Sequence, residues 1–308
     1  MLRPLVLALF TLTAGPFHWS LSATVPSASA AEPLNVVVTL PVLKDWAQQI
    51  GGSHVHVTSL MTGYESEHTY SPKPSDLVAV RKATLLLEVG AGLEVWVSSL
   101  VKNAGNATLQ VVTTSKGIEL IQDRVDPAEA TRAHHHPAGN PHVWLDPEAA
   151  ATMVQHISDA MTRADPAHAT NYLANTAAYL QALAHVHQES LARLQKVPSR
   201  TVIVHHPAWP YFARRYELEV GGTILMQPGG EPSARHLHTL IETIKRNHIR
   251  VILSEVQLNQ KIPQLLARET GARIAVLTTL PGGLPGTETY LDMLRYNVLQ
   301  LAQALEQA

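Results

Sequence analysis

From residue 35 onward, short runs of Val, Ile and Leu alternate with segments that have the periodicity of helices. Apolar runs of this kind are typical of strands buried on both faces of a parallel sheet. The first half of the chain predicts strands at 35–40, 55–61, 84–90 and 109–115, with helices at about 42–51, 74–82 and 93–104. A repeated strand–helix–strand pattern indicates an α/β fold in which helices flank a parallel sheet.

A polar, proline-rich stretch, RAHHHPAGNPHVWLDP, then interrupts the pattern and is expected to form a loop. Two helix starts follow, each an Asp before a Pro, at Asp146 and at Asp165. The second opens about thirty residues without an internal Gly or Pro, which would form a helix roughly 45 Å long. Because neither half of the chain needs a helix of that length, we interpret 166–197 as a rigid connector.

The alternation resumes after residue 200. Strands are predicted in TVIVHH, GTILM, VILSEV and IAVLTT, and helices at about 208–217, 233–247, 259–270 and 287–306. We therefore expect two α/β lobes, an N-terminal lobe (31–165, including the histidine-containing loop 133–141) and a C-terminal lobe (198–308), joined by the long helix. The sequence leaves a single large α/β domain open as the alternative.

Residues 1–30 are expected to be a signal peptide. The segment MLRPLVLALFTLTAGPF has an early basic residue and an apolar run too short to span a bilayer, and ASA precedes a suitable cleavage point. The sequence contains no Cys, so neither a disulfide nor a lipid-bearing Cys is expected. These features predict a periplasmic protein that is not a lipoprotein and does not insert into the membrane after cleavage.

Charge and composition narrow the ligand classes. The net charge is −2, aromatic residues make up 5% of the chain, and no long basic run occurs, so nucleic acid and anionic membranes are poor partners. The 17 histidines are many for a chain of this length. Because His is the commonest metal-binding side chain, they point to a metal.

Ligands of open α/β sheets bind in the crevice beyond the carboxyl ends of the strands. His68 follows the strand ending near residue 61, His142 lies in the loop NPHVWLDP, and the pair His205 and His206 closes TVIVHH. If the two lobes face each other, His68, His142 and one member of the pair would share a metal. Taken singly, each could instead hydrogen-bond loop backbone or end its strand.

The tract His134, His135 and His136 is a separate signal. A short histidine tract in a loop can capture metal weakly, and a solvated run is the alternative. The other histidines fall in the signal segment, in strands or on helix faces, and are interpreted as structural or surface residues.

Several stretches, in register over nearly the whole mature chain, resemble the metal-binding solute receptors of bacterial zinc and manganese ABC importers. They are SEHTYSPKPSD, NPHVWLDP, HHPAWPYFARRYEL, EPSARHLHTLIETIK, VILSEVQ, LARETGARIAVL and ETYLDMLRYNV. The resemblance implies two lobes joined by a long helix, a metal held between them, and delivery to an ABC transporter permease in the inner membrane. We expect the receptor to be a monomer.

By position, the resemblance implies that His68, His142 and His206 bind the metal, and that His205 does not. Many members also have an Asp after the last strand, but TTLPGGLPGTETY contains none. Zinc receptors of the family can use the Glu before the first His instead, which is Glu67 here. Glu67 or a water molecule is therefore expected to be the fourth ligand.

Three imidazoles with one carboxylate or water suit tetrahedral Zn²⁺, whereas Mn²⁺ prefers more oxygen ligands. Manganese-selective members resemble this chain except that a carboxylate replaces the third His, so His206 is expected to decide the metal. We expect a zinc receptor, with a manganese receptor or an adhesin of the same fold as alternatives. The absence of a lipid-anchor Cys counts against the adhesin.

A zinc hydrolase could also use three histidines and an open fourth position, with Glu67 as the base. The sequence shows no HExxH motif, and no second catalytic carboxylate at a strand end or oxyanion loop is identifiable in it. We therefore expect a binding protein and not an enzyme.

Overall fold

The computed structural model describes residues 32–122, 139–226 and 230–307. Residues 33–308 form one compact unit. The predicted signal peptide and the tract His134 to His136 lie outside the described residues.

The first sheet is parallel throughout, with strand order β2-β1-β3-β4. Its strands are β1 (Leu34–Val38), β2 (Val55–Ser59), β3 (Leu85–Glu88) and β4 (Gln110–Thr113). The central strands are buried on both faces, which is why they appear as continuous apolar runs in the sequence. The order reverses between β1 and β3, and this is where such sheets form a ligand crevice.

The second sheet repeats this topology, with order β6-β5-β7-β8 and parallel pairing. Its strands are β5 (Thr201–Val204), β6 (Glu219–Thr223), β7 (Val251–Glu255) and β8 (Arg273–Leu277). The prediction placed the edge strand at GTILM, three residues too late. A Cβ on Gly222 would lie 2.7 Å from a methyl carbon of Leu240, so the glycines allow α7 (Ala234–Arg246) to pack closely on the edge strand, although Gly usually signals a turn.

Most predicted helices are present with small shifts at their ends. They are α1 (Pro41–Gly51), α2 (Pro74–Lys82), α3 (Val97–Ala104), α4 (Pro147–Ala164), α6 (Pro210–Arg215), α8 (Lys261–Thr270) and α9 (Tyr290–Glu306). α9 begins at Tyr290 because the Thr289 hydroxyl accepts the backbone N–H of Asp292 as an N-cap. α3 begins four residues late because Glu94 is used in the preceding turn, where it accepts the backbone N–H groups of Val89 and Gly90.

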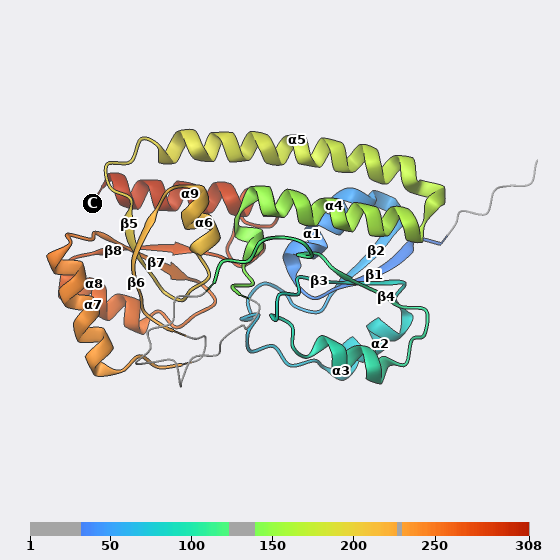
Figure 1. The fold of residues 1–308 in the computed structure, drawn as a ribbon, viewed down its shortest axis with the longest axis horizontal. Helices are drawn as coiled ribbons and strands as arrows, with labels where there is room; N and C mark the ends of the chain where they lie inside the picture. The colour runs from blue at the N-terminus through green and yellow to red at the C-terminus, as the bar shows by residue number, and fades with distance from the viewer. Residues whose placement is uncertain (1–31, 123–138, 227–229, 308) are drawn as a thin grey trace, which may run out of the picture. The chain divides into compact units, whose positions relative to one another are not determined.

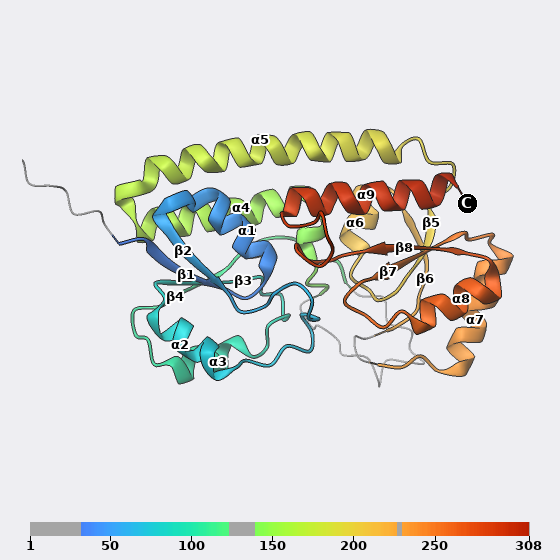
Figure 2. The same cartoon turned by 180° about the vertical axis from the view of Figure 1, so that it is seen from behind.

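The long helix α5 (Ala169–Leu194) contains 26 residues and packs against α1, α4 and α9. Figures 1 and 2 show α4, α5 and α9 along one side of the two sheets, with α2 and α3 on the other side of the first sheet and α7 and α8 on the other side of the second. One core cluster contains Val36 and Leu85 of the first sheet, Leu183 of α5 and Leu253 of the second sheet. The helix therefore contributes to a shared core along its length as well as joining the lobes.

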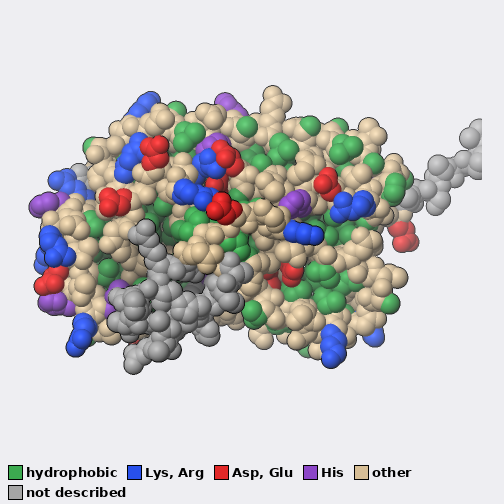
Figure 3. Space-filling view, viewed as in Figure 1, with side chains coloured by type: hydrophobic (Ala, Val, Ile, Leu, Met, Phe, Trp, Pro, Cys, Tyr) green, Lys and Arg blue, Asp and Glu red, His purple; other side chains and the backbone are tan. Residues whose placement is uncertain are grey.

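The fold confirms the expected class: two lobes, each with a parallel sheet flanked by helices, and one long helix. On the face shown in Figure 3, acidic and basic side chains are interspersed, in keeping with the small net charge. Within the described ranges, no helix combines the length and the apolar character needed to cross a membrane.

Candidate metal centre

The four residues predicted as metal ligands lie together. Glu67, His68, His142 and His206 each offer one ligand atom, and these atoms all lie within 4.8 Å of one another. Nε2 of His142 is 3.0 Å from Nε2 of His68, 3.4 Å from Nε2 of His206 and 3.4 Å from Oε1 of Glu67. Two Zn–N bonds of about 2.0–2.1 Å at the tetrahedral angle would separate their nitrogen atoms by roughly 3.3–3.4 Å. The three distances from His142 are therefore close to the edges of a tetrahedral zinc site.

The ligand atoms come from three separate segments. Glu67 and His68 lie in the loop between β2 and α2, His142 precedes the 3₁₀ turn Val143–Leu145 that leads into α4, and His206 follows β5. The backbone N–H of Thr69 donates to the carbonyl of Ser66 at 3.2 Å, so Glu67 and His68 occupy the middle of a turn. A turn allows both side chains to face one side, which an extended segment would prevent.

His205 is not part of the cluster. Its Nδ1 lies 3.1 Å from the hydroxyl oxygen of Ser254, and the side chain is buried. Burial lowers the pKa of His205 below its ordinary value. The structure thus places His206 in the cluster and His205 outside it, whereas the residues TVIVHH alone did not show which of the two binds a metal.

Asn140 fixes the tautomer of His142. The amide Nδ2 of Asn140 donates to the carbonyl of Pro207 at 2.6 Å, so its Oδ1 faces Nδ1 of His142 at 3.0 Å. The backbone N–H of His142 donates to the same oxygen at 3.1 Å. Because Oδ1 can only accept, Nδ1 of His142 carries the hydrogen and Nε2 presents its lone pair to the cluster.

His206 has a buried carboxylate behind it. Its Nδ1 contacts Oε2 of Glu255, the last residue of β7, and the other oxygen of Glu255 accepts the indole N–H of Trp209 at 2.7 Å. His206 and Glu255 are 3% and 1% exposed. A carboxylate that holds the distal nitrogen of a metal-binding His is a common supporting arrangement in metal sites.

The His142 and His206 segments are also joined to each other. The Tyr211 hydroxyl donates to the carbonyl of Asn140 at 2.7 Å, and Arg215 binds Asp146 through two bonds of 2.8 and 3.0 Å. Asp146 is also the N-cap of α4, where it accepts the backbone N–H of Glu148. These contacts join the segments of the two lobes that carry the two imidazoles.

The loop that carries Glu67 and His68 contacts the second lobe at Gly63. The side chain of Gln257 donates to the Gly63 carbonyl at 3.0 Å. Gly63 has φ of +99°, and a Cβ there would lie 2.5 Å from the carbonyl oxygen of Pro281. Glycine is required at this position, because both the backbone conformation and the close contact exclude a side chain.

The loop after β8 contributes no carboxylate to the cluster, as its sequence predicted. Its carbonyl at Thr279 instead accepts the indole N–H of Trp144 at 2.7 Å. Glu67 is 4% exposed, and its Oε1 makes no hydrogen bond to the described residues. A buried carboxylate oxygen without a donor is costly, and a cation among the three imidazoles would satisfy it.

Sequence reasoning missed two supporting residues, Asn140 and Glu255. It also identified no second carboxylate at a strand end, whereas Glu255 closes the buried strand VILSE. The sequence signal for Glu255 was a charged residue at the end of a strand whose other residues are typical of a buried strand. Its carboxylate faces Nδ1 of His206 and Trp209, not the position where a substrate would meet a metal.

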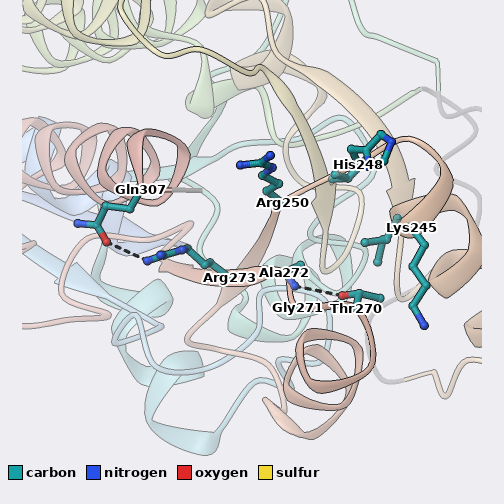
Figure 4. Close-up of a pocket in the computed structure, with 10 residues that line it drawn as sticks. Lys245, His248, Arg250, Thr270, Gly271, Ala272, Arg273 and Gln307 are labelled. Carbon is teal, nitrogen blue, oxygen red and sulfur yellow. Dashed lines mark hydrogen bonds between the residues drawn. The ribbon is translucent and has the colours of Figure 1, made fainter.

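A pocket of about 460 Å³ lies elsewhere in the second lobe (Figure 4). It is lined at the starts of β7 and β8 by residues that include Lys245, His248, Arg250, Arg273 and Gln307. No Asp or Glu lines it, and none of the predicted ligands does. Lys245 lies in the last turn of α7, where the helix dipole favours a cation, so its charge has a local structural explanation.

Two parallel sheets spanned by one long helix, with a histidine cluster where loops of the two lobes meet, define a metal-binding receptor of ABC importers. Residues 36–304 match the family described as ZnuA, zinc-uptake complex component A, periplasmic. The chain belongs to this family, which confirms the resemblance.

Curated relatives include proteins named for either metal. A Treponema pallidum (strain Nichols) protein described as metal-binding is 29% identical over 280 residues, covering 89% of this chain and 87% of its own. Zinc-binding protein AdcA of Streptococcus pyogenes serotype M3 is 26% identical over 95% of this chain, which spans only 60% of AdcA. Manganese-binding lipoprotein MntA of Halalkalibacterium halodurans is 28% identical, with 90% of each chain covered.

Solved structures agree with the fold. A crystal structure of ZnuA superposes with a TM-score of 0.78 at 30% identity, covering 88% of this chain and 99% of that one. A mutant of the laminin-binding adhesin Lmb from Streptococcus agalactiae gives 0.77 at 28% identity, with 88% and 99% covered. The family is that of a zinc-uptake component, and the relatives are named as metal-binding proteins or adhesins. The expectation that the protein is not an enzyme is therefore confirmed, and the hydrolase alternative is set aside.

Proposed function

We propose that the protein is a periplasmic receptor that captures Zn²⁺ between its two lobes and delivers it to an ABC-type permease in the inner membrane. The observation that carries this proposal is the convergence of three imidazole nitrogens and one carboxylate oxygen within 4.8 Å. In this proposal residues 1–30 direct export, the lobes are 31–165 and 198–308, and 166–197 connects them. The receptor acts as a monomer and is not a lipoprotein.

The donor set favours zinc over manganese. His68, His142 and His206 supply nitrogen, and nitrogen sites bind Zn²⁺ more tightly than Mn²⁺ in the general affinity order. We take Glu67 as the fourth ligand because its Oε1 lies as far from His142 as the neighbouring imidazole of His206 does. The turn at Ser66–Thr69 supports this role, since it lets both side chains reach one metal.

Manganese is the second candidate cargo. It is favoured by the relative MntA, which is named for manganese and aligns over 90% of this chain. The buried carboxylate of Glu67 also provides the kind of oxygen ligand that Mn²⁺ prefers. Competition between the two metals for the purified receptor separates these candidates.

Metal content by mass spectrometry of protein purified without chelators, with calorimetric titration, tests the function. One tightly bound zinc per chain is expected. His142→Ala should weaken zinc binding at least tenfold, about 1.4 kcal/mol. His238→Ala is the matched control, because that imidazole is 72% exposed and lies outside the cluster. If His142→Ala binds zinc as tightly as the unaltered protein, the shared site is wrong.

We further propose that His134, His135 and His136 capture zinc weakly and are dispensable for the tight site. Deleting the tract should remove low-affinity binding in the same titration and leave the tight event intact. Loss of the tight event would place the tract in the primary site.

A further inference from the structure

We propose that Glu255 is a positioning residue that determines how His206 binds the metal. In this inference, which rests on the proposed zinc site, Glu255 holds the His206 imidazole in the tautomer with the Nε2 lone pair toward the cluster. It also adds a second negative charge, which the loop after β8 does not provide. None of the predicted ligands supplies either function.

The hydrogen-bonding capacity of Glu255 carries the first part. Oε1 accepts the indole N–H of Trp209 at 2.7 Å, and an indole N–H can only donate. Oε2 contacts Nδ1 of His206. A carboxylate oxygen accepts hydrogen bonds, so Nδ1 of His206 donates to Oε2. The Gln260 amide donates to the backbone carbonyl of Glu255 at 2.6 Å and fixes this end of β7.

Burial and charge carry the second part. Glu255 is 1% exposed and forms no ion pair with Lys or Arg in the described part of the chain. A buried carboxylate without a cation is unfavourable. A divalent cation on the far nitrogen of His206 would compensate it through the imidazole. With Glu67, two carboxylates would then balance the two charges of the metal.

His142 provides an internal comparison. Its distal nitrogen meets the neutral amide of Asn140 at 3.0 Å, whereas that of His206 meets a carboxylate. The two imidazoles are both fixed at Nδ1, but only His206 gains electron density from an anion. Loss of charge at residue 255 should therefore affect His206 and leave the His142 ring unchanged.

The variant Glu255→Gln keeps the shape of the side chain. Its amide cannot accept both the Trp209 N–H and the Nδ1–H of His206, so the imidazole must change tautomer or lose its contact. Zinc affinity is expected to fall about tenfold to a hundredfold. Glu88→Gln is the matched control, because Glu88 ends the corresponding strand β3 of the first sheet and accepts the Thr113 hydroxyl at 2.7 Å, outside the cluster. We expect it to reduce affinity by less than threefold.

Nitrogen-15 NMR of the histidine rings in the metal-free protein tests the positioning directly. In the unaltered protein, the hydrogen of His206 should be on Nδ1, and in Glu255→Gln that signal should move or disappear while the His142 signal stays. A hydrogen on Nε2 in the unaltered protein overturns the inference, even if the variant fails to fold. A folded Glu255→Gln protein with unchanged zinc affinity overturns it as well. If the unaltered protein binds no zinc, the proposed function fails, but the tautomer result still decides the role of Glu255.

Discussion

The two sheets have the same strand order but use their carboxyl ends differently. In the first lobe, buried Glu94 accepts the Thr39 hydroxyl at 2.7 Å and the backbone N–H groups of Val89 and Gly90 at 2.8 and 2.9 Å. All three donors belong to that lobe, so the carboxylate joins the segments that follow β1 and β3 within it. In the second lobe, Glu255 contacts His206, which reaches toward the other lobe. The same topology thus supports a structural carboxylate in one lobe and a site carboxylate in the other.

The residues that follow the first strand of each sheet show the same difference. Thr39 and Leu40 follow β1, whereas two histidines, His205 and His206, follow β5. All four side chains are buried. The first lobe therefore supplies its ligands from loops further along the chain. A repeated fold produces an asymmetric site because only the strand ends and loops differ.

The largest expected effect on zinc affinity comes from replacing His206 with the residue type found at the corresponding position of the first sheet. His206→Leu gives the second sheet the residue type that Leu40 provides in the first, deletes a ligand and leaves Glu255 beside an apolar side chain. Zinc affinity should fall at least a hundredfold, about 2.7 kcal/mol. Competition titration with a chromophoric chelator measures it, with His238→Leu as the control. Affinity within threefold of the unaltered protein would remove His206 from the site.

Glu67→Gln is expected to have the next largest effect. The substitution keeps the shape of the side chain and removes its charge. If Glu67 binds the metal directly, zinc affinity should fall by at least about tenfold to a hundredfold, the loss typical of residues that only support a ligand. A loss of only a few-fold would indicate that water completes the site. The same competition titration distinguishes the two outcomes.

Glu94→Gln should barely change zinc affinity but should alter the pH dependence of stability. Burial raises the pKa of Glu94 from 4.5 to about 7. Between these values the folded state keeps a proton that the unfolded chain has lost, so this group's contribution to stability falls as pH rises through the window. The full effect is on the order of 3 kcal/mol.

Denaturant unfolding at pH 5 and pH 8 measures how much the free energy of unfolding falls between the two pH values. In Glu94→Gln this fall should be smaller by the contribution of Glu94, and zinc affinity at fixed pH should stay within twofold. An unchanged slope would mean that Glu94 is ionised throughout, and a large loss of affinity would mean that the first sheet's carboxylate also serves the site.

Much of the fold could be predicted from the sequence because buried parallel strands and helices have distinct periodicities. The cluster of Glu67, His68, His142 and His206 was also expected, although the family resemblance was needed to separate His206 from His205. The roles of Asn140 and Glu255 could not be predicted, because they depend on which ring nitrogen faces which neighbour. The edge strand was misplaced because local sequence does not show that Leu240 packs against Gly222.

A crystal structure of the zinc-loaded protein, with anomalous data on both sides of the zinc absorption edge, tests directly whether the three histidines and Glu67 share one metal. We expect one strong zinc peak about 2.0–2.1 Å from Nε2 of His68, His142 and His206, with Oε1 of Glu67 at a similar distance. A strong peak bound instead by the histidine tract at 134–136, or one that lacks His206 as a ligand, would contradict it.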